Sequence, residues 1–225
     1  PYRMSKFSEG IDDLIRSMTE TYQGKKLGKQ ISKRIKRGRQ IPISSLFEEG
    51  LAILIEKFTS DDIKILVDFP VCYRLKPKER AKTIYPDIVL IRKESLIGIL
   101  EAKLDLGFLS PKWANKRKQV FKQLESKKEI LLRGEQYPVL QKFKKACVVL
   151  HAGNHKERLP GFRENVENPI FLISENHPHP NETMNPEEIE AYIKKVQKDS
   201  DNQKQWKIFE NLVLGFSKRQ KVRKS

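Results

Sequence analysis

The sequence predicts an α/β fold in which a mixed central sheet is flanked by helices. Apolar, strand-like runs alternate with segments of helical periodicity along the 225 residues, in the order helix, three strands, helix, strand, strand, helix. Short connections between the first three strands favour an antiparallel meander. A long helical segment then separates the third strand from the fourth, and such a segment suits a crossover connection in the same sheet.

The segments before the strands differ sharply in charge. Residues 11–22 have the spacing of a short amphipathic helix, and eight Lys and Arg residues without any acid follow over residues 25–39. We expect this stretch to be a basic arm that becomes ordered on a partner. Ser44 or Ser45 then provides the N-cap of a helix that runs to about Phe58.

The strands are expected where apolar runs are bounded by turn residues. These runs cover residues 63–75, 85–93, 95–105, 145–153 and 169–175. The helix between the third and fourth strands is expected at about residues 111–133, and the segment from Pro186 to about Lys218 is expected to be helical as well.

This pattern divides the chain into three regions. Residues 1–43 form the basic N-terminal helix and arm, and residues 44–180 form the core that contains all the expected strands. Residues 181–225 form a C-terminal helix and a basic tail, whose charges are Lys218, Arg219, Lys221, Arg223 and Lys224.

The composition limits the partners and the compartment. The chain has 45 Lys and Arg against 29 Asp and Glu, a formal charge of +16, which favours polyanions such as nucleic acid or an anionic membrane face. No apolar run approaches the roughly 20 residues that span a bilayer, so no spanning helix is expected. Cys72 and Cys147 lie in strand-like runs, and we expect buried free thiols in the cytoplasm or another reducing intracellular compartment.

Two acids and a lysine stand out within the expected hairpin. Asp87 follows Pro86, and Glu101 and Lys103 come fourteen and sixteen residues later. Side chains alternate along a strand, so Glu101 and Lys103 share a face. If residues 93–95 form the loop, Asp87 lies directly opposite Glu101. A two-residue loop would turn Asp87 to the other face unless a bulge restored the phase.

Such a cluster of charges is costly to assemble unless a divalent cation neutralises the acids. The plain alternative is a hairpin tip whose charges are only solvated. The sequence has no Gly-rich phosphate loop and no Ser, His and Asp arrangement that would be an alternative catalytic centre to this cluster of charges.

The motif Pro86-Asp87 … Glu101-Ala102-Lys103 resembles that of the PD-(D/E)xK, or restriction-endonuclease-like, nuclease superfamily. The element order over residues 44–153 is similar to that family's αβββαβ core. The resemblance implies a Mg²⁺-dependent DNA hydrolase that can also use Mn²⁺, an endonuclease of restriction, repair, recombination or mobile-element type. It implies that Asp87, Glu101 and the backbone carbonyl of Ala102 hold the metal. Lys103, held among acids, would stay protonated and orient the attacking water.

The resemblance also suggests a further acid on the helix before the first strand. Glu48 lies at the margin of the apolar face of that helix, whereas Glu49 and Glu56 point away from it, so Glu48 is the candidate third acid and metal ligand. A solvated margin position is the alternative.

Several residues are expected to contact the substrate. On the helix after the motif, Gln123 could touch the scissile phosphate or a metal-bound water, and Lys116 and Lys127 lie on the same margin; a polar helix edge is the alternative. The basic arm would neutralise further phosphates through Lys33, Arg34, Arg37 and Arg39, unless these charges are only solvated.

DNA is the expected partner, and RNA is a possible one. A second copy of the chain or a partner protein subunit is also compatible with the sequence. The competing function is a module that holds nucleic acid, or a nuclease-fold subunit of a larger complex, without turnover. Processing of RNA is the third hypothesis, and substrate choice alone separates it from the first.

Overall fold

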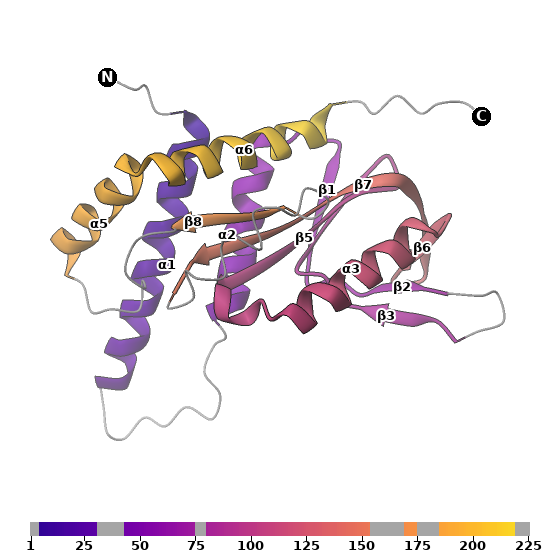
Figure 1. The fold of residues 1–225 in the computed structure, drawn as a ribbon, viewed down its shortest axis with the longest axis horizontal. Helices are drawn as coiled ribbons and strands as arrows, with labels where there is room; N and C mark the ends of the chain where they lie inside the picture. Colours follow the sequence, from indigo (N-terminus) through magenta and orange to yellow (C-terminus); the bar gives the residue numbers. More distant parts are fainter. Residues whose placement is uncertain (1–4, 31–42, 75–79, 154–168, 175–184, 219–225) are drawn as a thin grey trace.

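The computed structural model describes residues 5–30, 43–74, 80–153, 169–174 and 185–218 (Figure 1). Within these ranges the chain is a mixed α/β structure, in which five helices flank an open, mixed sheet. The helices are α1 (Lys6–Gln30), α2 (Ile43–Phe58), α3 (Pro111–Glu125), α5 (Pro186–Lys198) and α6 (Ser200–Ser217), and a 3-10 turn, η1, covers Leu106–Phe108.

The strands are β1 (Ile63–Val67), β2 (Val71–Tyr73), β3 (Lys82–Ile84), β4 (Ile88–Arg92), β5 (Ser95–Asp105), β6 (Glu129–Leu132), β7 (Glu135–His151) and β8 (Ile170–Ser174). Their order in the sheet is β1-β4-β5-β7-β6-β2-β3, and β8 pairs with β7. The expected antiparallel pairing of the first strands is confirmed, because β4 is antiparallel to both β1 and β5. The crossover is confirmed too, because β7 runs parallel to β5 after α3.

The single strand expected at residues 63–75 is wrong: the segment divides into β1 and β2. Asp68 adopts a left-handed conformation, with φ of 48°, and Pro70 has no N–H to donate. The pairing with β4 therefore ends after β1. The chain crosses to the other part of the sheet, where β2 pairs with β3 and β6.

The helix expected to reach residue 133 ends at Glu125. Residues 129–132 instead form β6, which a tight turn at Arg133 and Gly134 joins to β7. Both turn residues have positive φ, 48° and 89°, as in the type I′ turns that match the twist of a hairpin. This hairpin also explains why β7 begins at Glu135, ten residues before the expected strand.

The two faces of the sheet are covered by different helices. On one face, a large apolar cluster joins the sheet to α1, α2, α5 and α6. On the other face, α3 packs through Phe121 and Leu124 onto β4, β5 and β7. In Figure 1, α6 and α3 accordingly lie on opposite sides of β5 and β7.

The N-terminal helix is longer than the segment expected at residues 11–22, and α1 includes the first residues of the expected basic arm. Its side chains Phe7, Ile11 and Ile15 are fully buried in the same cluster as the sheet and the C-terminal helices. The described parts of the N- and C-terminal regions thus share one hydrophobic core with the strands.

Both thiols are free, but only Cys147 is buried; Cys72 is half-buried on β2, with Sγ 3.2 Å from the hydroxyl of Thr83. Burial of both cysteines was therefore a wrong expectation, because β2 lies near the open end of the sheet beside β3. Among the helices of the described ranges, none is both long and apolar enough to cross a bilayer.

Candidate active site

The register of the β4–β5 hairpin decides which face of the sheet the residues of the candidate site occupy. Arg92 pairs with Ser95, so the loop has two residues, Lys93 and Glu94, and the three-residue loop is wrong. Both loop residues have positive φ, 45° and 60°, which is the geometry of a type I′ turn. A bulge in β5 between Leu96 and Gly98 then adds one residue, so that Ile88 pairs with Leu100.

The bulge keeps Asp87 and Glu101 on one face of the sheet. This is the second of the two expected arrangements, a two-residue loop whose effect on the alternation is reversed by a bulge. Ile97 and Gly98 both face the cluster under α1, α2 and α6, where the missing Cβ of Gly98 leaves room for Phe216. Leu96 and Ile99 face the opposite cluster under α3. Continuing the alternation brings Glu101 and Lys103 to the α3 side of the sheet, together with Asp87.

Five polar groups meet at this point: an ammonium, two carboxylates, and the carbonyl and N–H of one backbone residue. The ammonium of Lys103 donates to Oδ2 of Asp87 and lies 3.3 Å from Oε2 of Glu101. It also donates to the carbonyl oxygen of Ala102, at 3.0 Å. The N–H of Ala102 in turn donates to Oδ2 of Asp87, at 2.7 Å. Lys103 therefore bridges both carboxylates and the one backbone carbonyl between them.

The two carboxylates differ in their surroundings. The side chain of Asp87 is 16% exposed and that of Glu101 only 1% exposed. Burial raises the pKa of Glu101 to about 7; the Arg117 charge opposes this increase and the Asp87 charge adds to it. The site thus has one accessible acid and one acid that carries a proton over part of the neutral pH range.

Lys103 keeps its charge in this setting. Burial lowers the pKa of Lys103, but the charges of Glu101 and Asp87 outweigh burial, and the net pKa is raised. An ammonium held this way is a hydrogen-bond donor and an electrostatic partner rather than a proton acceptor.

Arg117 is a member of the site that the sequence interpretation missed. Its guanidinium Nη2 lies 2.7 Å from Oε2 of Glu101. A signal was present: Arg117 follows Trp113 by four residues and precedes Phe121 by four, so it interrupts the apolar stripe of α3. A charge in the middle of such a stripe needs a partner across the helix–sheet interface.

Glu48 is electrostatically part of the group. Burial raises its pKa to about 6, and the charge of Asp87 adds to this, while Lys103 opposes it. Glu48 is half-buried and Glu49 is exposed, in agreement with the expected helix face. Asp68, whose N–H donates to the carbonyl of Asp87 at 3.0 Å, is a further nearby acid that the sequence interpretation did not include.

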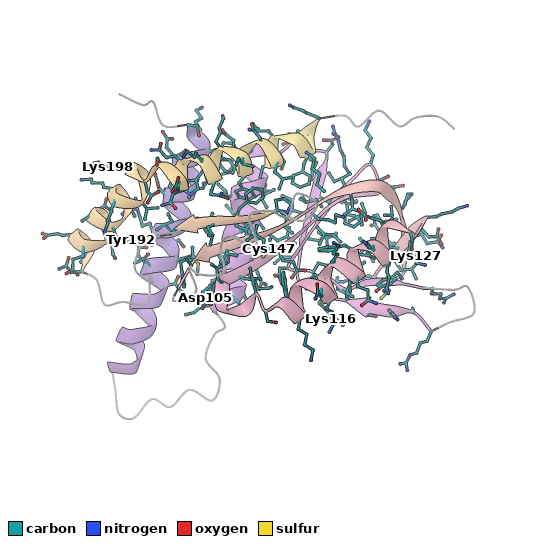
Figure 2. All side chains as sticks on the ribbon, in the orientation of Figure 1. Asp105, Lys116, Lys127, Cys147, Tyr192 and Lys198 are labelled. Atoms are coloured by element: carbon teal, nitrogen blue, oxygen red, sulfur yellow. The ribbon has the colours of Figure 1, made fainter. Side chains whose placement is uncertain are left out.

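The structure places the residues that were expected to contact the substrate in different surroundings. Oε1 of Gln123 accepts a hydrogen bond from the hydroxyl of Tyr73, at 3.0 Å, so this contact ties α3 to β2 instead of joining the acids. Lys127 is half-buried, whereas Lys116 is exposed on α3 (Figure 2). The four arm residues lie outside the described ranges; they are Lys33, Arg34, Arg37 and Arg39.

The interior side of the site is apolar and closed. Glu101 pairs in register with Cys147 on β7, which lies among the strands in the middle of the molecule (Figure 2). Burial, with the Glu101 charge next, raises the pKa of Cys147, so its thiol stays protonated. Leu106, Leu109 and Leu172 pack beside Cys147. Solvent therefore reaches the acids from the Asp87 side.

The donor atoms fit a hard divalent cation in kind. Carboxylate oxygens of Asp87 and Glu101 and the carbonyl oxygen of Ala102 are ligands that Mg²⁺ prefers. Oε1 of Glu101 is buried and has no hydrogen-bond partner within the described residues, as expected for an oxygen that a cation would coordinate. In the ranges that the structure covers, no three His, Cys, Asp or Glu side chains converge at metal-ligand distances. The cations Lys103 and Arg117 hold the acids instead.

No protein-family model, curated protein or solved structure matches the chain. The chemistry of the site is that of clustered acids with two cations at the solvent-accessible end of a hairpin. Such a site can hold a divalent ion, orient a water molecule and stabilise an anion.

Proposed function

We propose that the chain is a Mg²⁺-dependent hydrolase that cuts phosphodiester bonds of duplex DNA, with Asp87, Glu101 and Lys103 as its catalytic residues. The observation that carries this proposal is the meeting of these three side chains on one face, with the Lys103 ammonium between the two carboxylates. The PD-(D/E)xK motif has the same residue types in the same chain order.

The topology supports the proposal of a restriction-endonuclease-like core. The elements α2, β1, β4, β5, α3 and β7 follow the order αβββαβ. The first three of these strands are antiparallel neighbours, and the fourth is parallel to β5. Of the four remaining strands, β2, β3 and β6 are then insertions that widen the sheet beside this core, and β8 adds to the sheet next to β7.

The residues that would hold Mg²⁺ are Asp87, Glu101 and the carbonyl of Ala102, with Glu48 as a third acid. When bound, the ion supplies charge that lowers the repulsion between nucleophile and phosphate and stabilises the leaving oxygen. Asp87 is the accessible ligand, and its Oδ2 is already oriented by the N–H of Ala102.

Lys103 would orient the attacking water and stabilise charge that develops on the phosphate. Its raised pKa keeps the ammonium charged at neutral pH, so it donates hydrogen bonds and does not accept the proton of the water. Asp87 and Glu101 hold the ammonium in place from two sides, which restricts its motion before the substrate binds.

The surface beside the site has the charge that a nucleic acid requires. The contact between Gln123 and Tyr73 shows that one margin of α3 lies against β2. Exposed cations on that margin and on the β2–β3 ribbon are Lys112, Lys116, Arg74, Arg80 and Lys82. Tyr85, two residues before Asp87, is 60% exposed and offers an aromatic face to a base. We propose that this basic surface binds the phosphates that flank the scissile bond.

The test is cleavage of supercoiled plasmid and of linear duplex, with Mg²⁺ or with EDTA. We expect the wild-type protein to cut in Mg²⁺ only and Asp87→Ala and Lys103→Ala to lose this activity. The control variants Asp61→Ala and Lys64→Ala remove the same charges at exposed positions and should cut like the wild type. Cleavage that persists in both site variants would contradict the proposal.

A module that holds nucleic acid without cutting it is the second candidate. It is favoured by the observation that Lys103 and Arg117 already neutralise Asp87 and Glu101. Salt-sensitive duplex binding without any Mg²⁺-dependent cleavage by the wild type would establish it. The same assay on duplex and single-stranded RNA separates DNA from RNA as the substrate.

A further inference from the structure

Arg117 differs from the other basic residues of α3. Lys112, Lys116, Lys118 and Lys122 are exposed, whereas Arg117 turns toward the sheet and its side chain is 20% exposed. It belongs to the helix after the motif, and the Glu101 that it contacts belongs to β5. A cation is therefore placed at the buried acid of the proposed metal site, within reach of solvent.

The pair of Arg117 and Glu101 is incompletely hydrogen-bonded. Arginine can offer two parallel N–H groups to the two oxygens of a carboxylate. Here Nη2 contacts only Oε2, which Lys103 also approaches, while Oε1 is buried without a hydrogen-bond partner among the described residues. A buried acceptor without a hydrogen-bond partner destabilises the folded state. A pair that served stability alone would be expected to use both oxygens.

The charges of the site explain what a divalent ion would do to this pair. Two cations, Lys103 and Arg117, face four acids, and with every acid ionised the formal charge is −2; the acids are Asp87, Glu101, Glu48 and Asp68. Adding a divalent ion brings that sum to zero, which removes the excess negative charge that attracts the guanidinium. An ion on Glu101 would then compete with the guanidinium for the same carboxylate and repel it.

We propose that Arg117 is a displaceable cation, which holds Glu101 when no divalent ion is bound and moves onto a phosphate oxygen of the substrate when the ion takes its place. The inference rests on the proposed function. Guanidinium groups pair with phosphate as readily as with carboxylate, and the displaced group would lie between the acids and the exposed lysines of α3. Metal binding would in this way raise the affinity for the substrate, and the substrate would raise the affinity for metal.

The first measurement is Mg²⁺ binding without nucleic acid, by isothermal titration calorimetry. Arg117→Met keeps an unbranched, flexible side chain over the helix–sheet contact and removes the charge, so it should bind Mg²⁺ about 5- to 10-fold more tightly than the wild type. Lys118→Met is the matched control: it removes a charge from the next residue, which is exposed on α3. Its Mg²⁺ affinity should stay within about twofold of the wild type.

The second measurement is binding of a 20-base-pair duplex with and without Ca²⁺, a divalent ion that also prefers oxygen ligands. Ca²⁺ should raise the duplex affinity of the wild type and of Lys118→Met about 5-fold or more, but not that of Arg117→Met. Melting followed by tryptophan fluorescence checks folding. If Arg117→Met lacks a cooperative transition, Arg117→Gln, which can still donate to Glu101, replaces it.

Equal Mg²⁺ affinity in Arg117→Met and Lys118→Met would overturn the inference and leave Arg117 as a fixed partner of Glu101. The proposed function would survive that result if Mg²⁺-dependent cleavage were still lost in Asp87→Ala. No detectable Mg²⁺ binding by the wild type would overturn both.

Discussion

The N–H of Ala102 donates a 2.7 Å hydrogen bond to Oδ2 of Asp87, across the hairpin formed by β4 and β5. This bond ties the first acid of the site to the backbone between Glu101 and Lys103. The acid is therefore oriented by the strand that carries the other two side chains. Its position depends on the hairpin register and thus on the bulge in β5.

Because Gly98 lies at the bulge and against Phe216, we expect a larger side chain at this position to destabilise the fold. A Cβ at this position would lie 2.4 Å from Phe216 and 3.0 Å from Leu90, so Gly98→Ala should lower the free energy of unfolding by about 1–3 kcal/mol. Urea unfolding monitored by the fluorescence of Trp206, which is buried beside β8, measures it. In the double variant Gly98→Ala/Phe216→Leu, the leucine is smaller than the phenylalanine that it replaces. It should therefore restore part of the free energy of unfolding that Gly98→Ala loses. Strictly additive effects would show that the two residues do not collide.

The buried acid predicts a dependence of stability on pH. The pKa of Glu101 is about 7 in the folded protein and ordinarily 4.5, so between these values the folded state holds a proton that the unfolded state has released. The free energy of unfolding should therefore fall as pH rises from about 4.5 through about 7, by at most about 3 kcal/mol from this group. Glu48 and Asp12, whose pKa values are also raised, act in the same direction.

Glu101→Gln isolates the contribution of that acid. Urea unfolding in EDTA at pH 5 and pH 8 should show a smaller loss of stability in the variant than in the wild type, because glutamine does not titrate. Mg²⁺ should stabilise the wild type more at pH 8 than at pH 5, since the ion requires the deprotonated carboxylate. Parallel pH profiles for the two proteins would contradict the assignment.

Glu48 is expected to support the metal without being essential. Glu48→Gln removes one acid beside Asp87, and we expect Mg²⁺ affinity to fall about 10-fold, with cleavage recovering at high Mg²⁺. Glu49→Gln is the control, because it removes the same charge from the exposed neighbour. An equal effect of both substitutions would mean that only the overall charge of α2 matters.

Tyr85 is expected to act on substrate binding alone. Its ring is 60% exposed two residues before Asp87, and base–aromatic stacking contributes about 1–3 kcal/mol per base. Tyr85→Ala should weaken binding of a duplex with frayed or single-stranded ends about 5-fold or more, and Tyr85→Phe should restore it. Mg²⁺ affinity should be unchanged in both variants. Loss of binding in Tyr85→Phe would point to the hydroxyl instead of the ring.

Local patterns were enough to predict part of the architecture. The apolar face of α2, with Phe47, Leu51 and Ile55 buried, follows from helical spacing. The alternation in β5 placed Glu101 and Lys103 on one face, because the period of a strand is local. The failures lie where local patterns are ambiguous. Residues 129–132 continue a helical pattern equally well, and only pairing with β7 makes them a strand.

The sequence by itself determined the residue types of the candidate site, their order, and the face shared by Glu101 and Lys103. Tertiary structure decided the rest. Whether Asp87 joins that face depends on a bulge that Phe216 of α6 helps to specify, and α6 is more than a hundred residues away in the chain. The contact of Arg117 with Glu101 depends on how α3 packs over the sheet. Both are long-range contacts. Periodicity along the chain can mark Arg117 as a charge within an apolar stripe, but it does not identify the residue that Arg117 contacts.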